Sequence, residues 1–201
     1  QKKKNVVIIG GGIIGSLLAL ILGLNGFKVS IIDRQKKENF FSKSQSVKSY
    51  ALNEGSCRLL SILGLWDIVK KNSQPITKIL LQQGSNISSI QPFELKFTTD
   101  QKKSDHIFSM IEEIYLKKAI IEKFDECSNI EYLYSSKVSE QKIGDFSTRL
   151  VIENCQIINS DLVVASDGYP SSSAKEAKIK YFHKNYNQSS IVGIFKHKIP
   201  H

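Results

Sequence analysis

The chain has 201 residues, 41% of them hydrophobic and 23% charged, with a formal net charge of +9. This composition is typical of a globular chain with a sizeable core and excludes a disordered protein. Only Arg34, Arg58 and Arg149 are arginines, and the lysines are scattered among isoleucine, asparagine and serine. Because nucleic-acid surfaces favour arginine forks and interleaved aromatic residues, we expect no nucleic-acid partner. A general bias in residue usage explains the charge, with weak attraction to an anionic membrane surface as the alternative.

The three cysteines, Cys57, Cys127 and Cys155, are far apart and include no C-x-x-C pair. They predict buried thiols in a reducing compartment, and neither a disulfide framework nor a metal site. The first apolar segment is too short and too rich in glycine to span a bilayer, and residues 1–4 do not begin a signal peptide. We therefore expect a cytoplasmic protein, with a peripheral contact at the inner membrane face left open.

The first informative stretch begins with an apolar run at residues 6–9, which predicts a strand buried on both faces. Gly10, Gly12 and Gly15 follow it with the spacing G-x-G-x-x-G. Residues 16–24 are apolar nearly all round and predict a buried helix. This order of strand, glycines and helix is typical of the first half of a dinucleotide-binding unit.

The spacing of these residues has a chemical reason. Gly10 permits the tight turn out of the strand, Gly12 lets the backbone approach a pyrophosphate, and Gly15 lets the helix lie close to the sheet. The helix N-terminus offers free N–H groups to the phosphates. A second apolar strand, residues 28–32, ends at Asp33, whose carboxylate would accept hydrogen bonds from an adenosine ribose. The alternative is a glycine-rich turn that binds nothing, but the complete βαβ order argues against it.

Further along the chain, short strands alternate with a few helices. Asn53 is a candidate N-cap for a helix over residues 53–63, and Pro75 marks a boundary after which strand patterns dominate. Turns are expected at residues 84–86 and 144–145. The other expected elements are strands at residues 77–82, 93–98, 106–111, 130–134, 137–142, 148–153, 156–158, 161–166 and 190–197, and helices at residues 112–126 and 173–178.

A second informative stretch is the strand at residues 161–166, which is expected to be buried and which leads into Asp167-Gly168. This order places a carboxylate at the carboxyl edge of the sheet, where α/β folds bind ligands. Gly168 lets the backbone turn sharply beside a ligand. An Asp-Gly pair alone is more often a plain turn, so its weight comes from its pairing with the N-terminal glycines.

Three segments together resemble the flavin-dependent aromatic hydroxylases. They are residues 10–33 with their glycines and Asp33, residues 50–66 (Tyr-Ala-Leu-x-x-Gly-Ser-x-Arg-Leu-Leu-x-x-Leu-Gly-Leu-Trp), and residues 161–168 (Asp-Leu-Val-Val-Ala-Ser-Asp-Gly). The second segment and residues 186–192 resemble more narrowly the ubiquinone-biosynthesis hydroxylases that act on polyprenyl phenols. The resemblance implies an α/β fold with a Rossmann-like FAD-binding domain that carries an inserted, mainly β region on the substrate side.

The resemblance also implies roles for single residues. Asp33 would bind the adenosine ribose of FAD, and Asp167 with Gly168 would lie near its pyrophosphate and ribityl chain. Arg58 would contact the phosphate or ribityl region, unless it is a solvated helix arginine. The cofactor-binding residues implied in this way are Gly10, Gly11, Gly12, Ile14, Gly15, Asp33, Arg34, Arg58, Asp167 and Gly168.

The family's chemistry belongs to its cofactor. NAD(P)H reduces FAD, and O2 then hydroxylates an electron-rich phenol ring, so the resemblance assigns no catalytic side chain and no metal. The implied substrate is a polyprenyl phenol, with other ubiquinone-pathway enzymes as further partners. The alternatives are a non-catalytic FAD- or ADP-binding remnant and a half-protein that needs a partner chain. An NAD-dependent dehydrogenase domain is disfavoured by the inserted strands and the helix of Arg58.

By the same resemblance, residues 1–75 form the first part of the FAD-binding domain and residues 76–105 the inserted β region. Residues 106–180 form the second part with a β meander, and residues 181–201 begin a substrate-binding sheet that is incomplete. The family's third flavin motif, a Gly-Asp segment, is absent. We therefore expect the chain to be the N-terminal part of a hydroxylase.

Overall fold

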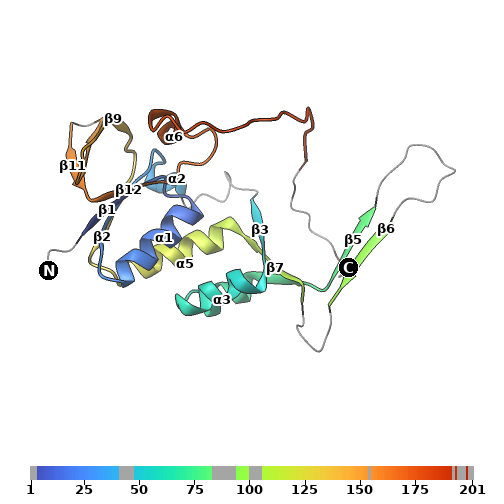
Figure 1. Cartoon of the computed structure of the whole chain (residues 1–201). Coiled ribbons are helices and arrows are strands. Elements are labelled where there is room, and N and C mark those ends of the chain that lie inside the picture. Colours follow the sequence, from blue (N-terminus) through green and yellow to red (C-terminus); the bar gives the residue numbers. More distant parts are fainter. Residues whose placement is uncertain are drawn as a thin grey trace. The chain divides into compact units, whose positions relative to one another are not determined.

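The computed structural model describes residues 4–40, 48–82, 94–99, 106–153, 155–191, 193 and 198 (Figure 1). By its internal contacts the chain divides into two compact units. The first unit comprises Gln1–Val47 and Leu116–His201, and the second comprises Lys48–Tyr115. Each unit has its own sheets and its own buried residues.

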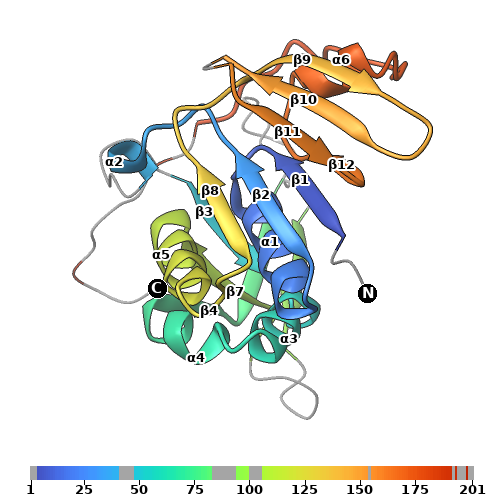
Figure 2. The same cartoon turned by 90° about the vertical axis from the view of Figure 1, so that its left-hand side faces the viewer.

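The first unit is built on a four-stranded parallel sheet with the strand order β12-β1-β2-β8. Helix α1 connects β1 to β2, and Figure 2 shows it lying against these strands. The elements are β1 (Asn5–Ile9), α1 (Ile13–Leu24), β2 (Lys28–Ile32), the part of α5 (Glu113–Phe124) from Leu116 on, β8 (Ile130–Leu133) and β12 (Leu162–Ala165). This arrangement confirms the predicted βαβ unit and the α/β class.

The parallel register brings the carboxyl ends of three strands to one level. Ile9, the last residue of β1, pairs with Ile32 at the end of β2 and with Ala165 at the end of β12. The loops that follow these strands therefore emerge side by side at one edge of the sheet. At such an edge, open α/β sheets bind their ligands.

Helix α1 is buried on one side only, so the expectation of burial nearly all round is wrong. Gly15, Ala19 and Gly23 recur every four residues and lie on one buried face. A Cβ on Gly23 would come within 2.5 Å of Ile130 Cδ1 in β8, so this face approaches the sheet closely. Leu20 is fully buried as well, but most of the other large apolar side chains of α1 are only partly buried, and Ile14 is 73% exposed.

Strand β1 is buried as predicted, since its central residues are almost inaccessible, but β12 is not. Leu162 of β12 is 54% exposed and Ala165 is also exposed. The reason is the position of β12 at the edge of the sheet, next to β1 alone.

The prediction for the cysteines needs a similar correction: Cys57 and Cys127 are buried, whereas Cys155 lies exposed in a turn.

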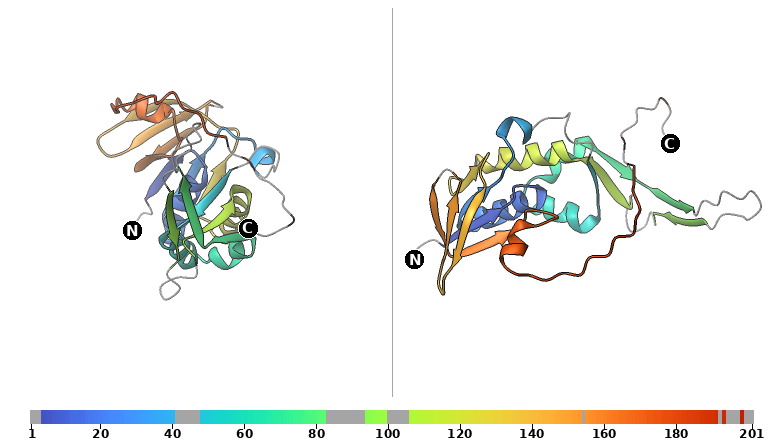
Figure 3. Two further views of the ribbon diagram at one scale, coloured as in Figure 1. Left: turned by 90° about the vertical axis from the view of Figure 1, so that its right-hand side faces the viewer. Right: turned by 90° about the horizontal axis from the view of Figure 1, so that it is seen from above.

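A three-stranded antiparallel meander with the order β11-β10-β9 completes the first unit (Figure 3). Leu150 and Ile152 of β10 form a buried cluster with Val7 and Ile32, so the meander covers one face of the parallel sheet. The N–H of Gly144 donates to the carbonyl oxygen of Ser147 at 2.9 Å, which confirms the predicted turn. The remaining elements are β9 (Val138–Ile143), β10 (Thr148–Ile152), β11 (Ile157–Ser160), α2 (Lys37–Phe40) and α6 (Ser172–Glu176).

The second unit contains an antiparallel sheet with the order β3-β7-β4 and a two-stranded ribbon of β5 and β6. Asn53 caps helix α3 as predicted, because its Oδ1 accepts the N–H of Ser56 at 2.8 Å. The elements are β3 (Ser49–Leu52), α3 (Glu54–Ile62), α4 (Trp66–Val69), the 3-10 turn η2 (Lys70–Asn72), β4 (Ser73–Ile76), β5 (Lys78–Gln82), β6 (Glu94–Thr98) and β7 (Phe108–Glu112).

Pro75 lies inside β4, where it pairs with Ser109 of β7. Proline is tolerated there because β4 is an edge strand. The division at residues 75, 105 and 180 into cofactor and substrate segments stays a prediction. The expected turn at residues 84–86 and most of the strand at 190–197 lie outside the described residues, while residues 190 and 191 form no strand.

In the described part of the chain, no helix has the length and apolar character needed to cross a membrane.

Candidate functional site

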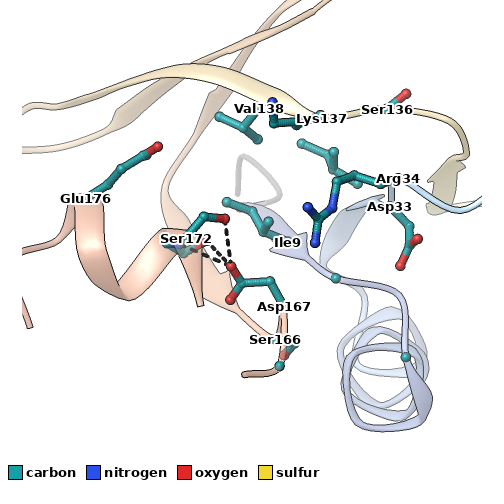
Figure 4. A pocket seen from close by; sticks show the side chains of 15 residues that line it. Ile9, Asp33, Arg34, Ser136, Lys137, Val138, Ser166, Asp167, Ser172 and Glu176 are labelled. Atoms are coloured by element: carbon teal, nitrogen blue, oxygen red, sulfur yellow. Dashed lines mark hydrogen bonds between the residues drawn. The ribbon is translucent and has the colours of Figure 1, made fainter. Parts of the chain in front are cut away.

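A cavity of about 260 Å³ lies at the carboxyl ends of β12, β1 and β2 (Figure 4). Six of the residues singled out from the sequence line it together: Gly10, Gly12, Asp33, Arg34, Asp167 and Gly168. The other lining residues are Ile9, Ile32, Ser136, Lys137, Val138, Ser166, Ser172, Ser173 and Glu176. The two informative stretches of the sequence, more than a hundred residues apart, therefore meet at one site.

The glycine loop between β1 and α1 is tightly packed on one side and open on the other. Gly10 has a φ of +101°, and a Cβ there would collide with the carbonyl oxygen of Ser166 after β12. A Cβ on Gly15 would collide with the carbonyl oxygen of Gly10. At Gly12, in contrast, a Cβ would meet no atom within 4 Å. The backbone of Gly12, at the N-terminus of α1, is thus accessible to a ligand from the cavity.

Asp33 follows β2 and its carboxylate is held in place by two backbone groups. Its Oδ2 accepts the N–H of Gly11 at 2.5 Å, and its Oδ1 accepts the N–H of Gln35 at 2.7 Å. An ionised carboxylate has about four acceptor sites, so each oxygen can accept a further hydrogen bond. Asp33 is therefore able to receive the hydroxyl groups of a sugar at the cavity wall.

Arg34 and Lys137 bring positive charge to the cavity. In Figure 4 the guanidinium of Arg34 extends from the end of β2 toward Ile9. Lys137 also forms an ion pair with Glu153, with 3.0 Å between Nζ and Oε1. A planar guanidinium can bind a phosphate by two parallel hydrogen bonds or stack on a flat ring, so Arg34 offers either contact to a nucleotide.

Asp167 accepts hydrogen bonds from Ser171, the N-cap of α6, and from Ser172 and Ser173, its first two residues. Its Oδ1 accepts the hydroxyl of Ser171 at 2.7 Å, while its Oδ2 accepts the hydroxyls of Ser172 and Ser173 and the N–H of Ser173, each at 3.1 Å. Burial acts to raise the pKa of Asp167, but these hydrogen bonds outweigh it, and the pKa is lowered overall. The ionised carboxylate thus shapes the loop in which Gly168, with a φ of +75°, faces the cavity.

Two parts of the site were missed by the sequence reasoning. Tyr132 of β8 donates its hydroxyl to the carbonyl oxygen of Gly11 at 3.1 Å, and a Cβ on Gly11 would collide with that hydroxyl. Residues 136–138 form a wall of the cavity, where the N–H of Ser136 donates to the carbonyl oxygen of Asp33 at 2.8 Å. Both depend on β8 lying beside β2, which no local pattern indicates.

Some of the expected cofactor residues do not line the cavity. Gly11 and Gly15 serve the packing of the loop, and the exposed Ile14 lies on the first turn of α1. Arg58 belongs to the second unit, where it is 72% exposed and pairs with Glu54 at 3.0 Å. A role for Arg58 at the cofactor stays a prediction. Among the described residues, no group of three or more His, Cys, Asp or Glu side chains could hold a metal ion.

Comparison with known proteins identifies a family that matches this chain. A family model described as "FAD binding domain" matches residues 3–200. The chain is 26% identical over 201 residues to the ubiquinone hydroxylase UbiL of Rhodospirillum rubrum, and the alignment covers 100% of this chain and 46% of that protein. It is 24% identical over 189 residues to the 3-demethoxyubiquinol 3-hydroxylase of Escherichia coli, covering 93% of this chain and 47% of that protein. The chain thus spans about half the length of the curated relatives it matches.

Solved structures show the same fold. A mutant of PqsL from P. aeruginosa superposes with a TM-score of 0.76 at 17% identity, covering 92% of this chain and 48% of PqsL. The p-nitrophenol 4-monooxygenase PnpA from Pseudomonas putida superposes with a TM-score of 0.71 at 20% identity, covering 87% of this chain and 43% of PnpA. These matches confirm the predicted Rossmann-like α/β architecture.

Proposed function

Since the chain belongs to the FAD binding domain family, we propose that it forms part of an FAD-dependent monooxygenase and that its cavity receives the ADP half of FAD. The substrate that we propose is a polyprenyl phenol of ubiquinone biosynthesis, hydroxylated with NAD(P)H and O2. The single observation that carries the proposal is the free space beside Gly12, bounded by the fixed carboxylate of Asp33.

The residues around the cavity fit an adenosine diphosphate group. The accessible backbone of Gly12 and the N-terminus of α1 would bind the pyrophosphate, as helix N-termini bind phosphates in general. Asp33 would accept the ribose hydroxyls, and Arg34 would supply a positive charge or a flat surface beside the nucleotide. Gly168 would let the loop after β12 approach the cofactor closely, with Asp167 shaping that loop.

When bound, FAD would take electrons from NAD(P)H and supply the oxygen-transfer chemistry with O2. The described residues have a supporting task, which is to bind and orient the cofactor. The Asp33 carboxylate and the glycine loop would hold the nucleotide end of the cofactor.

The choice of substrate class is supported by the names of the relatives. UbiL and the 3-demethoxyubiquinol 3-hydroxylase are ubiquinone-pathway hydroxylases by name. We further propose a cytoplasmic location with a peripheral contact at the inner membrane face, to which the net charge of +9 would add a weak attraction. Other ubiquinone-pathway enzymes are the partners that this location suggests.

The second candidate is an FAD- or ADP-binding remnant without catalytic activity, or a half-protein that needs a partner chain. A single preparation of the 201-residue chain separates the two candidates. Yellow protein whose NAD(P)H oxidation rises when a phenol is added supports the monooxygenase. Protein that binds FAD but oxidises no NAD(P)H supports the second candidate, and protein that takes up no added FAD contradicts both.

A further inference from the structure

Both peptide groups that flank Gly11 are held by side chains from different elements. The N–H of Gly11 donates to Asp33 Oδ2, at the end of β2, over 2.5 Å. Its carbonyl oxygen accepts the hydroxyl of Tyr132 of β8 at 3.1 Å and the hydroxyl of Ser16 of α1 at 3.0 Å. Three hydrogen bonds within the protein therefore fix the conformation of the loop without any ligand.

The hold on the Gly11 carbonyl also fixes the direction of the next N–H group. In a planar trans peptide the carbonyl of one residue and the N–H of the next point in opposite directions. Because Tyr132 and Ser16 bind the Gly11 carbonyl, the N–H of Gly12 is directed away from both of them. Gly12 lines the cavity, whereas neither Tyr132 nor Ser16 does. Within the described residues, no hydrogen bond of the Gly12 N–H to another backbone group is observed.

We propose that Tyr132 is a positioning residue for diphosphate binding: its hydroxyl orients the Gly11–Gly12 peptide so that the Gly12 N–H faces the phosphates. Tyr132 contacts the loop from behind and touches no ligand itself. This inference rests on the proposed role of the cavity as the site of the ADP half of the cofactor. It adds a residue from β8, more than a hundred positions after the glycine motif, to the machinery of that site.

The packing around Tyr132 suits this task. Its ring stacks on that of Tyr134, with 4.0 Å between centroids and 17° between planes, and it is tilted against the ring of Phe124, with 6.5 Å between centroids. These contacts restrict the ring and so place the hydroxyl over the loop. Burial, with the nearby charge of Asp33, raises the pKa of Tyr132, so the hydroxyl keeps its proton and remains a donor.

The test compares two ligands in the 201-residue chain, ADP and adenosine, by titration followed by NMR or calorimetry. Tyr132→Phe keeps the ring and removes the hydroxyl. We expect it to weaken ADP binding by about three- to tenfold, the usual effect of one hydrogen bond, and to leave adenosine binding unchanged. Tyr186→Phe, at a tyrosine that is 71% exposed, is the matched control and should change neither affinity.

The ratio of the two affinities separates positioning from a general structural role. A merely structural Tyr132 would weaken ADP and adenosine equally, because both need the ribose site at Asp33, and that result overturns the inference. Equal ADP affinity in the wild type and Tyr132→Phe overturns it as well, while leaving the proposed function intact. If the wild-type chain binds ADP no more tightly than adenosine, the proposed diphosphate site is contradicted, and this inference with it.

Discussion

Asp33 and Gly11 are joined by a 2.5 Å hydrogen bond from the Gly11 N–H to the Asp33 carboxylate, which ties the end of β2 to the loop that follows β1. The acid that the sequence suggests as a sugar ligand thus has a second task, since it also holds the glycine loop. A change at Asp33 should therefore affect the binding of both the sugar and the diphosphate.

Asp33→Ala is expected to weaken ADP binding by about 1–3 kcal/mol, the cost of leaving polar groups unpaired. Adenosine binding should fall as well, unlike in Tyr132→Phe. Asp33→Asn is the matched variant, because its amide oxygen can still accept one of the two backbone N–H groups, and its loss should be smaller. Calorimetric titration measures all of these affinities, and an unchanged ADP affinity in Asp33→Ala would contradict the ribose role.

Gly12→Val is expected to abolish ADP and FAD binding while leaving the fold intact. A Cβ at Gly12 meets no protein atom within 4 Å, so the added side chain enters only the space that we assign to the pyrophosphate. The melting temperature should stay close to that of the wild type, and an ADP titration should give no signal. Retained affinity in this variant would show that the phosphates bind elsewhere.

Gly10→Ala is expected to behave in the opposite way and to destabilise the protein itself. Its Cβ would collide with the carbonyl oxygen of Ser166, and its φ of +101° is strained for any residue with a side chain. Strained backbone of this kind costs on the order of 1–3 kcal/mol, to which the collision adds. Urea denaturation measures the loss, and a stability equal to that of the wild type would contradict the close packing of the loop on β12.

Leu150→Ala tests the contact between the meander and the parallel sheet. Leu150 is fully buried in a cluster with Val7 and Ile32, so its truncation should lower the free energy of unfolding by about 2–5 kcal/mol. Phe146→Ala is the control, because Phe146 in the β9–β10 turn is 93% exposed and its loss should cost little. Similar denaturation midpoints for the two variants would argue against this core.

The stability of the first unit should also depend on Asp167 at acid pH. Because the folded state lowers the pKa of this carboxyl, the ionised form contributes stability that is fully present above the ordinary Asp pKa of about 4. That contribution is lost as the pH falls below this value and through the lower pKa of the folded state. In Asp167→Asn this part of the pH dependence should disappear, which denaturation curves between about pH 2 and 6 will show.

The local elements of the site could be predicted from the sequence because each has a short-range signal. The glycine spacing and the apolar runs around it predicted β1, α1 and β2. Such signals report the steric and capping needs of a few neighbouring residues. The site residues Gly10, Gly12, Asp33 and Asp167 were found in this way, and they line one cavity.

What could not be predicted depends on pairing between distant strands. Tyr132 reaches the glycine loop only because β8 lies beside β2, and β12 is exposed only because it lies at the edge. The sequences of β3 and β4 show only weak strand patterns, and both strands are stabilised by pairing with β7. The requirement for glycine at position 11 likewise comes from Tyr132, not from its neighbours in the sequence.

A crystal structure of the 201-residue chain with ADP tests the central claim most directly. We expect phosphate oxygens within hydrogen-bonding distance of the Gly12 N–H and a ribose hydroxyl on the carboxylate of Asp33. ADP bound at any other place, or a cavity that stays free of ADP at saturating concentration, would contradict it.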